Sequence, residues 1–273
     1  LGGDNSLPKD VQDKFRRTGI IHIVVLSGYN ISLVVLVVMF LANFFLPRTF
    51  AYLLTSIFIT VFVLFVGAGA STVRAALMTV LVLYGKFSYR KVNILRLLSV
   101  AGCIMVFHNP YIVAFDPSFQ LSFLATLGLI IFSEYIGKYI PAFLPLPFKE
   151  ILAATIATQV FVLPLILYQS GEFPLMTLPV NILVLPLIPV VMFFAFLTGI
   201  GALFAPFIAL PFSLLTTFFI SYIFSVVNIF SSLPFSTFPF HIPFYGVVII
   251  YFCYGIVMFF LNKKFLRLRA EGK

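Results

Sequence analysis

The sequence predicts an all-α protein, a polytopic transmembrane helix bundle of about eight to nine membrane segments, some of them broken or re-entrant. Hydrophobic residues make up 62% of the chain, charged residues 9%, and the mean hydropathy is +1.16. A soluble domain has about 25% charged residues because its surface must face water. Residues 173–262 contain no Lys, Arg, Asp or Glu, which is enough chain for several crossings at about 20 residues each.

Nine stretches are apolar enough to be membrane segments, and they cover residues 20–45, 50–66, 70–85, 92–108, 119–136, 150–168, 178–204, 206–232 and 244–262. Glycine and proline interrupt the pattern at 67–85 and at 174–190. Interrupted helices survive at membrane depth only where protein or a wet cavity satisfies their backbone, so the interruptions are weak pointers to a site. Residues 70–85 either span the membrane or re-enter it, which makes the count nine or eight.

The placement of Lys and Arg predicts the topology. Basic residues favour the cytoplasmic side, which here takes the sites at Arg48, 86–96, Lys138, Lys149 and 263–273. The loops at 67–70, 109–118, 169–175 and 233–243 contain neither residue and are expected outside. Nine segments then place the N-terminus outside and the C-terminus inside.

We expect three regions: a polar interfacial leader at 1–19, a transmembrane domain at 20–262 and a basic cytoplasmic tail at 263–273. The four cations Lys9, Lys14, Arg16 and Arg17 conflict with an external leader, although an interfacial helix would soften this conflict. The chain starts at Leu1 with no signal-peptide pattern, so we expect it to be a domain cut from a longer protein.

Arg74 is the clearest polar residue within a membrane segment. Ionisable groups there are costly and are functional by default. It follows Gly67, Gly69 and Ser71; the glycines permit close backbone approach, and Ser71 is a candidate N-cap for a helix. Such an arginine can hold a phosphate bidentately. The alternative is an arginine that snorkels to the interface or binds carbonyls of a neighbouring helix.

A second polar cluster combines His22 with Ser27, Gly28 and Asn30. The Ser-Gly pair is a plausible kink. Ordinary hydrogen bonding between helices by Ser, Asn and His is the competing explanation. The chain offers no nearby carboxylate to complete a triad.

Two further clusters lie later in the chain. Asp116 followed by Pro117 predicts a helix start, with Pro at the first helical position, whereas Gln120 and Ser122 lie too deep for capping to explain both. Gln159 and Asn181 are polar residues in apolar surroundings, and Pro186 interrupts the run that follows Asn181. A buried Asn must form hydrogen bonds within the protein.

No metal site, cofactor site or catalytic motif is predicted. The three histidines, His22, His108 and His241, show no metal-ligand spacing with each other or with the scattered carboxylates. There is no phosphate-binding loop, dinucleotide-binding turn or nucleophile elbow, so the sequence favours a protein that is not an enzyme.

Four motifs occur in series along the chain. They are Phe15-Arg-Arg-Thr-Gly-Ile-Ile-His22 with Leu26-Ser-Gly28, Gly69-Ala-Ser-Thr-Val-Arg-Ala-Ala-Leu-Met78, Asp116-Pro-Ser-Phe-Gln-Leu-Ser-Phe123, and Leu178-Pro-Val-Asn-Ile-Leu183 followed by Pro186. In this order they resemble the competence domain of the ComEC family of inner-membrane DNA-uptake channels. The chain departs from the family at one point, where Ser27-Gly-Tyr-Asn30 stands in place of Ser-Gly-Leu-His.

The resemblance implies passage of single-stranded DNA across the bacterial cytoplasmic membrane during natural transformation. Implied partners are DNA, the lipid bilayer, other proteins of the competence machinery, and flanking OB-like and metallo-β-lactamase-like domains of the parent chain. The translocation-path candidates are His22, Ser27, Asn30, Arg74, Gln120, Ser122 and Asn181, with structural roles for Gly28, Gly67, Gly69, Pro117 and Pro186.

Two other functions remain open on the residues alone. The first is a transporter of small solutes or lipid precursors that shares the fold. The second is an intramembrane enzyme that uses His22 and Ser27, which needs a carboxylate or a metal brought close by folding.

Overall fold

The computed structural model describes residues 8–24, 28–89, 92–141 and 143–256. The first half contains α1 (Lys9–Arg17), α2 (Ile21–Val24), α3 (Gly28–Phe45), α4 (Arg48–Val66), α5 (Ala70–Phe87), α6 (Ile94–His108) and α7 (Ile112–Phe115). The second half contains α8 (Pro117–Tyr139), α9 (Leu146–Ser170), β1 (Glu172–Pro174), α10 (Thr177–Val184), η1 (Leu185–Leu187), α11 (Ile188–Phe204), α12 (Pro206–Ser231) and β2 (Thr237–Pro239). A further helix spans Phe244–Ile256.

The predicted helical membrane bundle is confirmed. Seven helical spans among the described residues are long and apolar enough to cross a membrane, and two shorter apolar helices, Ile94–His108 and Phe244–Ile256, accompany them. Each of the nine predicted segments is therefore helical over most of its described residues. Large apolar side chains such as Phe40, Phe65 and Phe107 are exposed at 70%, 84% and 94%, as a lipid-facing surface requires.

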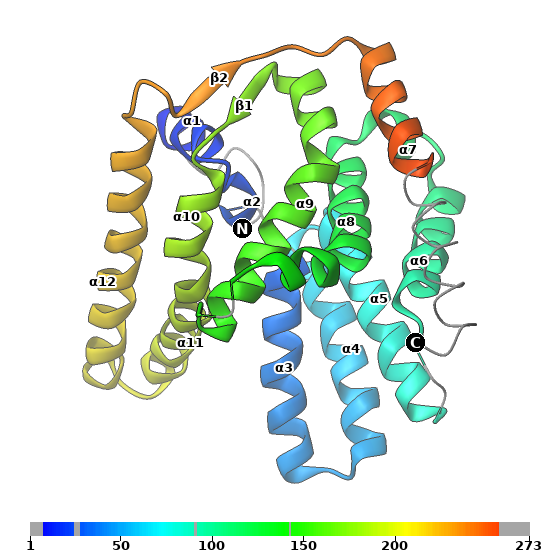
Figure 1. The fold of residues 1–273 in the computed structure, drawn as a ribbon. Coiled ribbons are helices and arrows are strands. Elements are labelled where there is room, and N and C mark those ends of the chain that lie inside the picture. The colour runs from blue at the N-terminus through cyan, green and yellow to red at the C-terminus, as the bar shows by residue number, and fades with distance from the viewer. Residues whose placement is uncertain (1–7, 25–27, 90–91, 142, 257–273) are drawn as a thin grey trace.

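The helices alternate between two ends of the bundle (Figure 1). At the upper end lie α1 and the two short strands, which pair antiparallel with Phe173 opposite Phe238. The turns between α3 and α4 and between α11 and α12 lie at the lower end. The strand pair ties the segment after α9 to the segment after α12.

Local sequence explains where the helices around the site start and stop. Asp116 is the N-cap of α8, as predicted, and its side chain accepts hydrogen bonds from the backbone N–H groups of Ser118 and Phe119. Gly67 ends α4 in the left-handed conformation, with φ of +100°, which glycine adopts at little cost. The prediction of Ser71 as an N-cap was wrong: α5 starts at Ala70, two residues before the start that a Ser71 cap would give, so that Gly69 is its N-cap.

Residues 70–85 form a complete helix. The 18 residues of α5 extend about 27 Å at 1.5 Å per residue, which favours a spanning segment over a re-entrant one. The predicted interruption near Pro186 is a turn of 3-10 helix, η1, between α10 and α11. Pro186 and Pro189 cannot donate backbone hydrogen bonds, so regular α-helix is lost there.

Close packing fixes the helices that carry the polar residues. Phe15 of α1 is 4% exposed and packs with Val180 and Val184 of α10 and with Val227 of α12. A second buried cluster joins α3, α4 and α5 through Ile31, Ile59, Val63, Ala75 and Ala76. Because lipid tails are as apolar as leucine, such contacts stabilise the bundle mainly through van der Waals packing.

Candidate functional site

Arg74 lies inside the bundle on α5. Its side chain is 8% exposed, and Nη1 donates a hydrogen bond to the backbone carbonyl of Ser122 on α8, 2.9 Å away. The start of α3 closes over it: a Cβ built on Gly28 would stand 2.7 Å from Arg74 Nη2. The structure thus brings Gly28, Arg74 and Ser122 together from three different helices.

Two polar atoms at this contact have no partner among the described residues. They are Arg74 Nε and Ser122 Oγ, both fully buried. The Ser122 carbonyl, in contrast, accepts a second hydrogen bond from Thr126 Oγ1 at 2.9 Å. Buried polar groups without protein partners ordinarily bind water or a ligand. The Arg74 Nε–H and the Ser122 hydroxyl can therefore donate hydrogen bonds to a polar ligand.

Asn181 forms a second polar contact, between α10 and α9. It is 4% exposed, and its Nδ2 donates to Thr155 Oγ1 at 3.3 Å. Its Oδ1 is buried without a partner among the described residues, and so is Nε2 of Gln159 on α9. Thr155 and Gln159 are four residues apart in one helix and therefore share a face.

These four partly unsatisfied residues, Arg74, Ser122, Gln159 and Asn181, form what we call the polar seam. They lie on α5, α8, α9 and α10, and each of these helices contacts the next: α5 packs on α8, α8 on α9 and α9 on α10. The seam combines one cation, one hydroxyl and two amides. These groups can form hydrogen bonds with water or with a polar chain.

Gln120, one of the predicted path residues, is held firmly at the upper end of α8. Its Nε2 donates to the backbone carbonyls of Val113 and Ala114, at 2.8 and 3.1 Å. Its Oε1 accepts from Nε2 of Gln169 on α9 at 3.0 Å. Gln120 therefore satisfies carbonyls of α7 and links α8 to the end of α9, two residues from Ser122.

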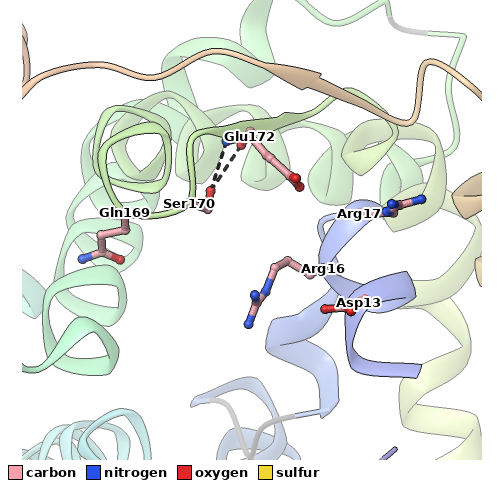
Figure 2. Close-up of a pocket in the computed structure, with 6 residues that line it drawn as sticks. All are labelled: Asp13, Arg16, Arg17, Gln169, Ser170 and Glu172. Atoms are coloured by element: carbon pink, nitrogen blue, oxygen red, sulfur yellow. Dashed lines mark hydrogen bonds between the residues drawn. The ribbon is translucent and has the colours of Figure 1, made fainter. Parts of the chain in front are cut away.

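A pocket of about 380 Å³ lies next to Gln169 at the end of the bundle (Figure 2). We call it the end pocket, and its lining residues are Asp13, Arg16 and Arg17 of α1 together with Gln169, Ser170 and Glu172. Both arginines are exposed. Neither forms an ion pair within the described part of the chain, where the salt bridges are Lys14–Asp10 and Lys138–Glu134. Their guanidinium groups are available to an external anion.

The other predicted residues are more dispersed. His22 is exposed on α2, and Asn30 is partly buried on α3, two residues after Gly28. Ser27 lies outside the described residues. Asn181 meets Thr155 rather than Arg74. Within the residues that the structure describes, no three His, Cys, Asp or Glu side chains gather in a way that could hold a metal ion.

Sequence reasoning did not identify Arg16, Arg17, Gln169 or Thr155 as site residues. The two arginines were interpreted as charges in conflict with an external leader and as part of the first family motif, and not as site residues. Their signal was present in the pattern around Phe15, because a buried aromatic followed by two basic residues fixes which side of α1 faces the bundle. Thr155 gave no such signal, because a threonine hydroxyl can bind a carbonyl of its own helix, and Gln169 lies at the end of its segment, where water can also satisfy it.

Comparison with known proteins places the chain in a family. A family profile described as "Competence protein" matches residues 1–265. The chain is similar to ComE operon protein 3 of Bacillus subtilis (strain 168), with 25% identity over 186 residues, or 67% of this chain and 23% of that protein. It is also similar to an uncharacterized protein of Aquifex aeolicus (strain VF5), with 32% identity over 127 residues, or 46% of this chain and 30% of that protein.

The chain thus spans less than a third of the length of either relative. No solved structure matches it significantly. The profile match covers nearly the whole sequence and agrees with the multi-pass helical fold and the serial polar motifs. The chain is a multi-pass membrane protein that belongs to the Competence protein family.

Proposed function

We propose that this chain is the channel domain through which single-stranded DNA crosses the bacterial cytoplasmic membrane during natural transformation. The observation that carries the proposal is the state of Arg74. It is a buried cation whose one hydrogen bond within the described residues goes to a backbone carbonyl, and its Nε–H remains free there. A charge in a membrane span costs about 2.5–3.5 kcal/mol on insertion scales. A buried arginine without a carboxylate partner can bind a phosphate of a strand in transit through its guanidinium N–H groups.

The end pocket provides an entrance at which Arg16 and Arg17 offer two exposed cations, beside the carboxylates of Asp13 and Glu172. Arg16 and Arg17 would meet phosphates first, and Gln169 and Gln120 connect this pocket with the level of Ser122 and Arg74. Few cations along the path are an advantage, because each phosphate contact adds to affinity and many contacts would hold the strand. His22 and Asn30 are proposed to line the path near Arg74, and Asn181 to line it beyond α9.

The distribution of charge supports an external position for the end pocket. The connections at 169–175 and 233–243, which contain no Lys or Arg, lie at the end of β1 and β2, and the turn between α3 and α4, which contains Arg48, lies at the lower end (Figure 1). The cations of α1 lie at the upper end too, where an interfacial helix would hold them beside the membrane surface. Basic loops favour the cytoplasm, so DNA would enter at the end pocket and leave at the lower end. On this proposal the N-terminus lies outside and the C-terminus inside.

The proposed role is conduction and not catalysis. Because the chain spans only 23% of ComE operon protein 3, any reaction that prepares the strand is assigned to other parts of a longer protein or to partner proteins. The polar leader at 1–19 and the basic tail at 263–273 would connect the channel domain with such parts.

The test uses Arg74→Ala in the full-length protein, with membrane levels matched to wild type. We expect transformation to be lost, and Arg74→Lys to give an intermediate result because lysine keeps the charge without the fork of donors. Arg96→Ala is the matched control, since Arg96 is exposed at the start of α6. Wild-type transformation by Arg74→Ala would overturn the assignment of Arg74.

A transport assay separates DNA from other cargo. Labelled single-stranded DNA is presented to proteoliposomes that contain the full-length protein, beside labelled small anions and lipid precursors. DNA transport that is lost in Arg74→Ala supports the proposal. Transport of the small cargo alone would replace the DNA channel with a solute or lipid-precursor transporter.

A further inference from the structure

Helix α9 contains a proline in its interior, Pro164. A residue at this position of an α-helix normally donates its backbone N–H to the carbonyl four residues earlier, which here is Val160. Proline has no N–H to donate, so the Val160 carbonyl needs another donor at membrane depth. Tyr254 supplies it: its hydroxyl donates to the Val160 carbonyl at 3.1 Å, from the helix Phe244–Ile256.

A second tyrosine of the same helix forms a hydrogen bond with the residue that follows Val160. The hydroxyl of Tyr251 donates to the carbonyl of Phe161 at 2.8 Å. The ring of Phe161 packs on the ring of Tyr254, with their centroids 5.4 Å apart. Two successive carbonyls on the N-terminal side of Pro164 therefore accept hydroxyl groups from one neighbouring helix, and of the two only the Val160 carbonyl lacks its helical donor.

Helix α8 holds this turn of α9 from another direction. A Cβ built on Gly128 would stand 2.7 Å from the carbonyl oxygen of Ala157 and 2.9 Å from Cβ of Phe161. Only glycine permits such an approach. Residues 157–161 are thus held between a glycine of α8 and two tyrosine hydroxyls of the helix Phe244–Ile256.

Gln159 of the polar seam lies within this turn, and Thr155, the partner of Asn181, lies one turn before it. We propose that Tyr251 and Tyr254 are positioning residues, which complete the backbone of α9 at Pro164 and thereby fix Thr155 against Asn181, with Gln159 on the same face of α9. The exchange of hydrogen-bond donors does not depend on what the protein transports. Only the consequence for DNA passage rests on the proposed function.

The competing explanation is that both tyrosines merely add stability to one helix contact. Pro164→Ala distinguishes the two, because alanine restores the N–H that Val160 lacks. With proline at this position, Tyr254→Phe leaves the Val160 carbonyl unpaired. In the Pro164→Ala background the same change leaves that carbonyl paired, and the hydroxyl becomes dispensable.

The first measurement uses a double-mutant cycle on full-length protein without native cysteines, in which Cys103 and Cys253, the two cysteines of the chain, are replaced by serine. Thr155→Cys and Asn181→Cys are joined by a short thiol crosslinker. The loss of one hydrogen bond predicts cross-linking roughly threefold to tenfold slower in Tyr254→Phe. We expect Pro164→Ala to remove most of this difference. Tyr222→Phe is the control, because Tyr222 is an exposed residue of α12.

The result that overturns the proposal is an equal effect of Tyr254→Phe in both backgrounds, or no effect in either. Transformation is measured in parallel, with Thr155 and Asn181 intact and membrane levels matched. If the cross-linking cycle is as expected and transformation is reduced, the result supports both the positioning role of the tyrosines and its consequence for DNA passage. The same cycle with normal transformation keeps the positioning role and removes the polar seam from the DNA path.

Discussion

Arg74 and Ser122 are joined by a hydrogen bond of 2.9 Å between a guanidinium group and a backbone carbonyl, across the contact of α5 and α8. The carbonyl orients the arginine without neutralising its charge. A carboxylate at the same place would form a closed ion pair and compete with any phosphate. The contact therefore keeps a cation both fixed and available within the bundle.

Substitution of Gly28 tests most directly whether the position of the Arg74 side chain matters. We expect Gly28→Ala to displace the end of the Arg74 side chain, because the new methyl group would stand 2.7 Å from Nη2. The displaced atom belongs to a flexible side chain, so the free energy of unfolding should fall by no more than about 1–3 kcal/mol, the range typical of an added methyl group in a packed interior. Transformation at matched membrane levels should nevertheless fall clearly.

Gly199→Ala is the control for that substitution. Nothing lies within 4 Å of a Cβ at Gly199 in α11, and alanine in a helix interior is favoured over glycine by about 0.8–1.0 kcal/mol. Gly199→Ala should therefore leave transformation unchanged. An equal loss of transformation in both variants would argue against a specific role for the contact between Gly28 and Arg74.

The two arginines of the end pocket should affect binding without affecting the fold. Both are exposed and form no ion pair within the described residues. If each contacts one phosphate, Arg16→Ala with Arg17→Ala should reduce the slope of log K against log salt for single-stranded DNA by about 1.4. The measurement is a salt titration of oligonucleotide binding to the full-length protein. Lys138→Ala, at the other end of the bundle, should leave the slope unchanged.

The contact between Asn181 and Thr155 can be measured by a double-mutant cycle. Thr155→Val removes the hydroxyl with little change in volume, and Asn181→Leu removes both amide groups. Hydrogen bonds between membrane helices couple by about 0.6 kcal/mol on average and reach about 1.7 kcal/mol. We expect a coupling energy in this range from unfolding in mixed micelles. Purely additive effects would show that the 3.3 Å contact contributes no net stability.

Asp116 should act as a cap and nothing more. Asp116→Ala removes the acceptor of the Ser118 and Phe119 N–H groups and should lower the free energy of unfolding by about 0.5–2 kcal/mol. Asp116→Asn keeps a capping oxygen and should recover most of this loss. A much larger effect of Asp116→Asn on transformation than on unfolding would instead assign the charge a role in transport.

Composition and local chemistry were sufficient to predict the helices. Apolar runs with few charged residues, separated by glycine, proline and basic residues, indicated the membrane segments, and the Asp116-Pro117 pair indicated the start of α8. These features act over one or two turns of chain, so they can be interpreted without knowledge of the partners.

The partners themselves were not predictable. Gln120 was singled out as a path residue, yet its amide binds carbonyls of α7 and the side chain of Gln169, 49 residues later in the chain. Arg74 meets a backbone carbonyl, which every residue possesses, so no side-chain pattern could indicate it. The proposed site depends on which helices pack together, and a single sequence does not contain that information in a local form.

The missing N–H of Pro164 has a consequence for how such sequences can vary. A carbonyl left without its donor by residue 164 is served by a hydroxyl 94 positions beyond Val160. Phenylalanine at 254 is tolerable only where residue 164 carries an amide hydrogen. Homologous chains that share this fold should therefore exchange the proline and the tyrosine together, and the two columns of an alignment should covary.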